Sequence, residues 1–140
     1  MSEENVEVVR RLYSLAPDAA GVVRGDYDDV FVDYFDPDFE LVPPSTYPDT
    51  ESSYRGQEGV RRWFQQLEEV WDDWRTESER FFDAGSQVVV FVRVSGTAKQ
   101  SGAALAISAA HVVTLRDGRV TRTDVFLDRS ESLEAAGLNE

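Results

Sequence analysis

Apolar residues recur every three or four positions in three stretches of the first half of the chain. The stretches cover residues 6–16, 27–35 and 60–74, and Pro17 and Pro37 end the first two. This spacing places the apolar side chains on one face of a helix, and proline cannot continue a helix interior. We therefore expect three helices, each with one buried face.

From Arg75 onward, apolar and polar residues alternate, which is the period of a β-strand. Turn-forming residues separate the alternating segments, among them Asp117-Gly118, a pair typical of a two-residue hairpin turn. We expect an antiparallel meander, preceded by a short strand at residues 39–42. The strands of the meander should cover residues 75–83, 86–98, 103–116 and 119–128.

The second of these long strands is apolar on both faces at its centre. One face carries the valines at positions 88, 90, 92 and 94, and the other carries Val89 and Phe91. Such a strand must be covered on both sides. We expect helices to cover one side and a second subunit to cover the other.

Three helices followed by a meander give an α+β fold, in which a curved antiparallel sheet wraps around the N-terminal helices. Asp128 is a suitable N-cap and Gly137 a suitable C-terminal residue for a short last helix, because each supplies the side chain or backbone freedom that a helix end needs. The length of 140 residues fits one domain over residues 1–140.

The composition narrows the choice of partners. The formal net charge is −13, from 14 basic and 27 acidic residues, which disfavours nucleic acid and acidic membranes as partners. There is no cysteine and one histidine, so thiolate chemistry and a multi-histidine metal site are excluded. No long apolar run indicates a leader or a membrane span. We expect a cytoplasmic protein without a cofactor or metal.

His111 is the single histidine, and counting back through the Asp117-Gly118 turn places it opposite Asp124. An imidazole that faces a carboxylate can transfer protons near neutral pH. The same count divides the hairpin into two faces. One holds His111, Arg122, Asp124 and Phe126, and the other holds Ala110, Val112, Thr123, Val125 and Leu127.

The second set is the more apolar, as the wall of a binding cavity usually is. In that arrangement His111 and Asp124 would form an orienting pair on the outer sheet face. In the opposite arrangement they would form a catalytic pair inside the cavity. The pattern leaves both arrangements open.

Six segments along the chain match a known family in their order. They are residues 5–13, 25–26, 35–40, 54–56, 110–118 and 126–129. Together they resemble the SnoaL-like branch of the nuclear-transport-factor-2-like superfamily. The resemblance implies a cone-shaped α+β barrel with an apolar cavity, and a homodimer formed through the outer sheet face.

Relatives of this kind include ketosteroid isomerases, polyketide cyclases, epoxide hydrolases and non-catalytic binding modules, so the fold alone does not decide the activity. Isomerase chemistry needs a carboxylate base, a tyrosine and a protonated aspartate. The resemblance puts Pro43, Leu12 and Ala110 in these three roles. We therefore do not expect steroid-type isomerisation.

The cyclase resemblance implies an acidic residue at Val125, one position beyond Asp124, and a one-residue shift in a strand reverses the face unless a bulge compensates. His111 would orient Asp124 or accept its proton. The epoxide-hydrolase resemblance rests on Arg122 and Asp124 around an activated water. An exposed ion pair between those two residues is the simpler interpretation.

The sequence therefore predicts a protein that binds a small hydrophobic or amphipathic molecule. Cofactor-independent acid/base catalysis by His111 and Asp124 is its enzymatic form, and a non-catalytic binding or dimeric interaction module is the alternative. The expected ligand-binding residues are Tyr34, Phe35, Trp63, Leu67, Ala110, Val112, Thr123 and Val125.

Overall fold

The change of period along the chain separates the helices from the long strands. The computed structural model describes residues 2–15, 25–44 and 52–138. No helix within these ranges is long and apolar enough to cross a membrane. The elements are α1 (Ser2–Ser14), α3 (Asp28–Tyr34), β1 (Phe35–Val42), β2 (Tyr54–Arg55), α4 (Gly56–Val70), β3 (Trp71–Ala84), β4 (Gln87–Ala98), β5 (Ala104–Arg116), β6 (Arg119–Phe126) and α5 (Arg129–Ala135).

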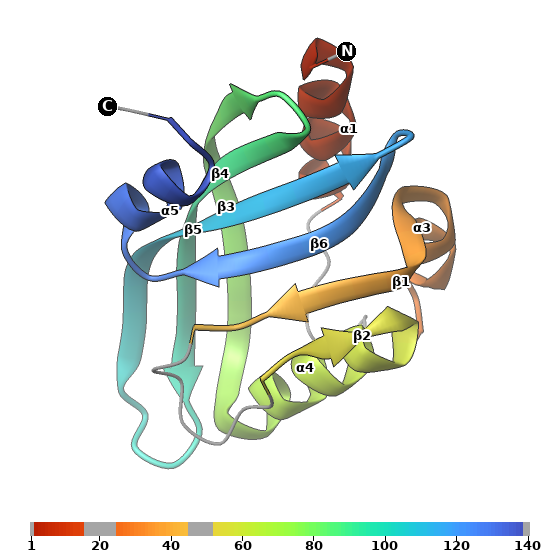
Figure 1. Cartoon of the computed structure of the whole chain (residues 1–140). Helices are drawn as coiled ribbons and strands as arrows, with labels where there is room; N and C mark the ends of the chain where they lie inside the picture. Colours follow the sequence, from red (N-terminus) through yellow and green to blue (C-terminus); the bar gives the residue numbers. More distant parts are fainter. Residues whose placement is uncertain (1, 16–24, 45–51, 139–140) are drawn as a thin grey trace.

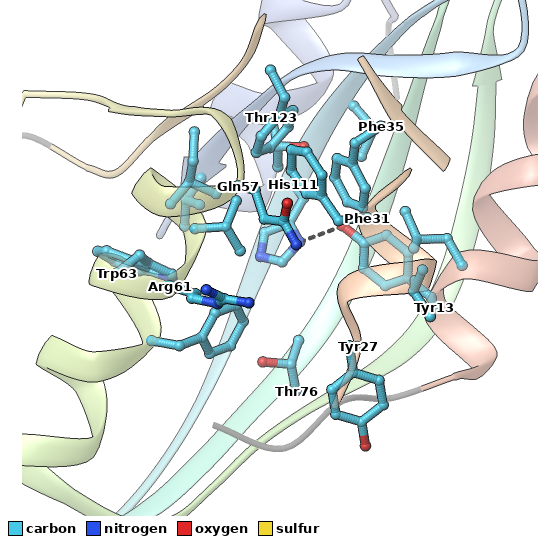
Figure 2. A pocket seen from close by; sticks show the side chains of 18 of the residues that line it. Tyr13, Tyr27, Phe31, Phe35, Gln57, Arg61, Trp63, Thr76, His111 and Thr123 are labelled. Carbon is cyan, nitrogen blue, oxygen red and sulfur yellow. Dashed lines mark hydrogen bonds between the residues drawn. The ribbon is translucent and has the colours of Figure 1, made fainter. Parts of the chain in front are cut away.

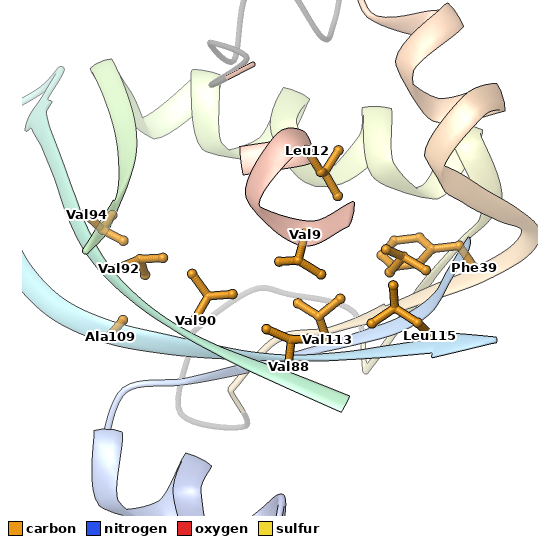
Figure 3. Close-up of a cluster of buried hydrophobic side chains, with 11 residues drawn as sticks. Val9, Leu12, Phe39, Val88, Val90, Val92, Val94, Ala109, Val113 and Leu115 are labelled. Carbon is orange, nitrogen blue, oxygen red and sulfur yellow. The ribbon is translucent and has the colours of Figure 1, made fainter. Parts of the chain in front are cut away.

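The strands form one curved sheet that does not close, in the order β2-β1-β6-β5-β4-β3. Strands β3 to β6 are the predicted antiparallel meander, and β1 joins it parallel to β6. Helices α1, α3 and α4 lie on one side of the sheet, and α5 lies on the other (Figure 1; Figure 3). The α+β fold class is confirmed.

Two expected element boundaries are wrong. The second helix ends at Tyr34, and β1 begins at Phe35, before Pro37. The third helix ends at Val70, so Trp71 and Trp74 belong to β3. A spacing of three fits a helix, but pairing of Trp71 with Ala98 across the β3–β4 ladder holds this segment in the sheet.

The inner face of the sheet carries the main core. Val88, Val90 and Val92 are fully buried there and pack beneath Val9 and Leu12 of α1 (Figure 3). Alternation along β4 directs every second valine to this side. The predicted apolar face of the first helix therefore packs on the predicted apolar face of β4.

The outer face of the sheet is covered locally by α5. Val89, Phe91, Ala110 and Val112 are buried there together with Leu133 of α5. The two-sided burial read from the sequence is thus met within one chain and does not require a second subunit. Dimerisation through this face stays a prediction.

Helix α5 has the predicted signals at both ends. The Asp128 side chain accepts hydrogen bonds from the backbone N–H groups of Ser130 and Glu131. At the other end, Gly137 has φ +77°, and the N–H of Leu138 donates to the carbonyl of Leu133. This is the hydrogen bonding of a Schellman motif, and it holds α5 to a fixed length over the outer face.

Candidate functional site

One extra residue in β6 decides which side chains face inward. The turn has the predicted form, with φ of +53° at Asp117 and +77° at Gly118. Leu115 pairs with Val120 as counted, but Thr114 pairs with Arg122, so Thr121 is left over. Thr121 is therefore a β-bulge, and every pair beyond it is displaced by one residue.

The bulge separates the two expected catalytic residues. His111 lies opposite Val125, and Asp124 lies opposite Val112. The predicted pairing of His111 with Asp124 is wrong, because residues at adjacent register positions of a strand point to opposite faces. His111 faces the interior, and Asp124 faces outward.

The same displacement divides the expected ligand-binding residues. Thr123 and Val125 line an internal pocket with His111. Ala110 and Val112 instead pack in the outer cluster against Leu133, so the expectation that they form the pocket wall is wrong.

The helical part of the expected set is also divided. Phe35 and Trp63 line the pocket. Tyr34 does not, and packs against the main core. Leu67 is buried one turn beyond Trp63, in a separate cluster with Tyr54, because its helical position directs it past the pocket.

The pocket lies between the inner sheet face and helices α1, α3 and α4, with a volume of about 200 Å³ (Figure 2). Its polar groups are few and come from separate elements, which is typical of a site for a small apolar ligand. Its aromatic walls include Phe31, Phe35, Phe39, Trp63, Phe64 and Trp74.

Tyr13 of α1 is the hydrogen-bond partner of His111. The phenol oxygen lies 2.6 Å from His111 Nδ1, and the two rings are 5.8 Å apart. Tyr13 is further held by an edge-on contact with Phe81, at 6.1 Å between centroids. Sequence reasoning missed this pair, because Tyr13 followed the apolar stripe of its helix and carried no separate signal.

Burial controls the protonation of both groups. It lowers the pKa of His111 from 6.5 to about 4 and raises the pKa of Tyr13, since a charged form is disfavoured in an apolar environment. At neutral pH the pair is therefore an uncharged imidazole and an uncharged phenol.

A second polar group in the pocket is an ion pair between helices. Arg61 of α4 places Nη2 2.5 Å from both carboxylate oxygens of Asp28 in α3. The hydrogen bond from Arg61 is the main cause that lowers the pKa of Asp28. These two residues are far apart in the sequence, and no local pattern predicts that they meet.

Asp124 belongs to an ion cluster on the outer face. It accepts hydrogen bonds from Nε of Arg122 at 3.0 Å and from Nη2 at 2.9 Å, and Glu40 lies 3.7 Å from the same guanidinium. Neither Arg122 nor Asp124 lines the pocket. This is the exposed ion pair expected as the simpler interpretation, and it leaves the epoxide-hydrolase arrangement without its residues in the pocket.

The described residues hold no group of three His, Cys, Asp or Glu side chains that could bind a metal ion. The pocket can instead supply an apolar surface, a neutral imidazole and a guanidinium. These groups can hold a ligand oxygen and exclude water from it.

A curved, largely antiparallel sheet with three helices on one face and a short helix on the other defines an α+β domain of the nuclear-transport-factor-2-like type. The chain belongs to the SnoaL-like domain family, whose model matches residues 9–123. The family resemblance read from the sequence is thereby confirmed. No curated protein matches the sequence.

Solved structures show the same fold over nearly the whole chain. A nuclear-transport-factor-2-like protein from Burkholderia thailandensis is 25% identical, with a TM-score of 0.72 over 96% of this chain and 98% of the other. TerC, co-crystallised with polyporic acid, is 23% identical, with a TM-score of 0.71 over 96% and 98%.

A protein from a Jannaschia species, named for its likeness to SnoaL-like polyketide cyclases, is 23% identical. Its TM-score is 0.69 over 99% of this chain and 94% of the other.

Proposed function

We propose that the protein binds a small, flat, largely apolar molecule in the pocket, with an oxygen acceptor of the ligand against His111. The single observation that carries the proposal is the hydrogen-bonding state of His111. Its Nδ1 is engaged by Tyr13, while Nε2 has no hydrogen-bond partner among the described residues. A polar atom that opens into a largely apolar pocket is available to fix the orientation of a ligand.

We infer the direction of the Tyr13–His111 hydrogen bond from the partners available to each group, and with it the group that a ligand would offer. The phenol has no other acceptor among the described residues, so we assign its proton to the hydrogen bond with Nδ1 of His111. The neutral imidazole then carries its own proton on Nε2. A carbonyl or an enolate oxygen is the matching group on a ligand.

Aromatic walls favour a planar ligand. Phe35 lies stacked on Phe31 at 5.1 Å and edge-on to Phe39 at 4.7 Å. Such rings offer both faces and edges to a flat molecule. Polyporic acid, with which TerC was co-crystallised, is therefore a suitable first probe for this chain.

Catalysis is the second candidate, and the same hydrogen bond favours it. An Nε2–H group placed against a carbonyl would stabilise negative charge that develops on the oxygen during cyclisation or isomerisation. Among the described residues that line the pocket, one carries a carboxylate that could act as a base, Asp28, which Arg61 holds. Because that carboxylate is already engaged, binding is better supported than turnover.

Isothermal titration calorimetry with polyporic acid and with methyl naphthoate tests the proposal. His111→Phe keeps an aromatic ring but removes the N–H donor, so we expect the Kd to rise about tenfold, the loss of about 1.4 kcal/mol typical of one hydrogen bond. Asp124→Asn is the matched control on the outer face and should bind as the parent does. Absence of saturable binding for both probes, or equal affinity in His111→Phe, would overturn the proposal.

A further inference from the structure

Arg61 is the one permanently charged cation among the described residues that line the pocket. It projects from α4 toward the same space that His111 enters from β5 (Figure 2). Its neighbour Arg62 is exposed and lies over the Tyr54 ring at 5.5 Å. One helix therefore directs one arginine into the pocket and the next away from it.

The Asp28 carboxylate does not satisfy the Arg61 guanidinium. Both carboxylate oxygens approach the same nitrogen, Nη2, whereas arginine binds a carboxylate best with two N–H groups side by side. Nε of Arg61 is buried and has no hydrogen-bond partner among the described residues. A donor left in this state is destabilising, so the guanidinium gains by turning toward a better acceptor.

Asp28 can leave without being stranded. Its side chain is 46% exposed and that of Arg61 is 40% exposed, so a displaced Asp28 carboxylate would be solvated by water. An ion pair this exposed contributes little to folding stability. Asp28 thus neutralises Arg61 in the absence of a ligand, and it can be replaced by another anion because water solvates its carboxylate.

We propose that Arg61 is the anion-recognition residue of the pocket, and that the ligand is a planar apolar acid whose carboxylate or enolate displaces Asp28. This inference rests on the proposed binding function and adds the charge of the ligand to it. The anion takes the Nε and Nη donors of Arg61, and the apolar body lies among the aromatic walls. Selectivity for an acid over its neutral ester follows.

Naphthoic acid and its methyl ester separate charge from shape. The acid is ionised at neutral pH, and both molecules carry the same ring system. In the parent protein we expect the acid to bind about tenfold more tightly than the ester, as charge-assisted hydrogen bonds exceed neutral ones. Titration calorimetry gives both constants for each folded variant.

The two partners of the ion pair should act in opposite directions. Arg61→Met should remove the preference for the acid and leave the ester constant unchanged. Asp28→Asn should tighten binding of the acid several-fold, because it removes the competing carboxylate while keeping the side-chain volume. Arg62→Met and Asp29→Asn change the net charge by the same amounts outside the pocket, so they should retain the parent preference.

The possible failures are distinguishable. If neither probe binds, the proposed function fails together with the inference. If both bind with equal affinity, or if the preference survives in Arg61→Met, the pocket binds ligands but Arg61 does not recognise their charge. An Asp28→Asn variant with an unchanged acid-to-ester ratio would make the ion pair structural and overturn displacement. Arg61→Lys keeps the positive charge but lacks the paired N–H donors of a guanidinium, so we expect it to keep part of the preference for the acid over the ester.

Discussion

The two faces of the β5–β6 hairpin place polar side chains in different environments. On the inner face, His111 is partly buried, uncharged and hydrogen-bonded to the Tyr13 phenol. On the outer face, Asp124 forms an ion pair with Arg122, whose side chain is half exposed. The residues are close in the ladder, yet the first lies in the pocket and the second lies on the surface.

A single bulge creates this difference. If Thr121 paired with Thr114 in a regular ladder, His111 and Asp124 would lie opposite each other on one face. Because Thr121 is a bulge, His111 shares the inner face with Thr123 and Val125. The Arg122–Asp124 ion pair then lies on the outer face. The comparison shows that the chemistry of the pocket depends on backbone register as much as on residue identity.

Inserting one alanine between Thr123 and Asp124 should have the largest effect, because it removes the difference between the two faces of the hairpin. A regular strand would then bring Asp124 inward, opposite His111, and bury its charge in an apolar pocket. We expect a loss of about 4 kcal/mol in the free energy of unfolding, the range seen for uncompensated buried charges. Urea denaturation followed by circular dichroism measures it.

Deletion of Thr121 is the matched control, because it removes the bulge while leaving the pairs from Arg122 onward in place. Its expected effect is about 1 kcal/mol, mainly from the lost hydrogen bond between the Thr121 hydroxyl and the Thr114 carbonyl at 3.2 Å. Equal destabilisation of the two variants would show that something other than the facing pattern sets the register.

The sequence was informative wherever one local pattern dominates. The alternating valines of β4, the Asp117-Gly118 turn and the signals at both ends of α5 predicted their elements closely. The helix boundaries failed at Phe35 and Trp71, where the apolar spacing suits a helix and a strand equally.

The candidate site was less predictable, for a physical reason. The bulge at Thr121 is marked by no glycine or proline, so the count through the turn passed over it. The Tyr13–His111 and Arg61–Asp28 contacts join elements that are distant in the sequence. Such contacts depend on how the helices pack on the sheet, and the spacing of apolar residues along the sequence does not predict this packing.

The next largest expected effect is the pH dependence caused by His111. Its pKa is about 4 in the fold against 6.5 for the ordinary side chain. Between these values the unfolded chain binds more protons, so the free energy of unfolding falls as the pH is lowered through this window. The loss should reach about 3 kcal/mol below pH 4 and be absent above pH 7, by linkage.

His111→Gln isolates this contribution from the titration of the many carboxylates. Glutamine can still accept the Tyr13 hydrogen bond but does not ionise. The stability difference between the parent and this variant, measured by urea denaturation from pH 7.5 to pH 4, should change by the same ~3 kcal/mol. A constant difference would contradict a His111 that stays uncharged in the folded protein.

Tyr13→Phe removes the inner-face hydrogen bond and keeps the ring against Phe81. Nδ1 of His111 would lose its donor, and we expect the protein to be destabilised by about 1–2 kcal/mol. Affinity for a carbonyl probe should fall as well, because the imidazole is no longer fixed with its proton on Nε2. Thermal unfolding and calorimetry measure the two effects. An unchanged probe affinity would show that the hydrogen bond from Tyr13 to His111 is not needed for binding.

The smallest expected effect lies on the outer face. Asp124→Asn weakens the ion pair with Arg122 but leaves Glu40 near the same guanidinium. Because the Arg122 side chain is 48% exposed, the change in unfolding free energy should stay below about 1 kcal/mol. Raising the salt concentration should reduce it further, since salt screens exposed charges. A loss comparable to that of Tyr13→Phe, or any change in probe affinity, would mean that the outer ion cluster is coupled to the pocket through the hairpin.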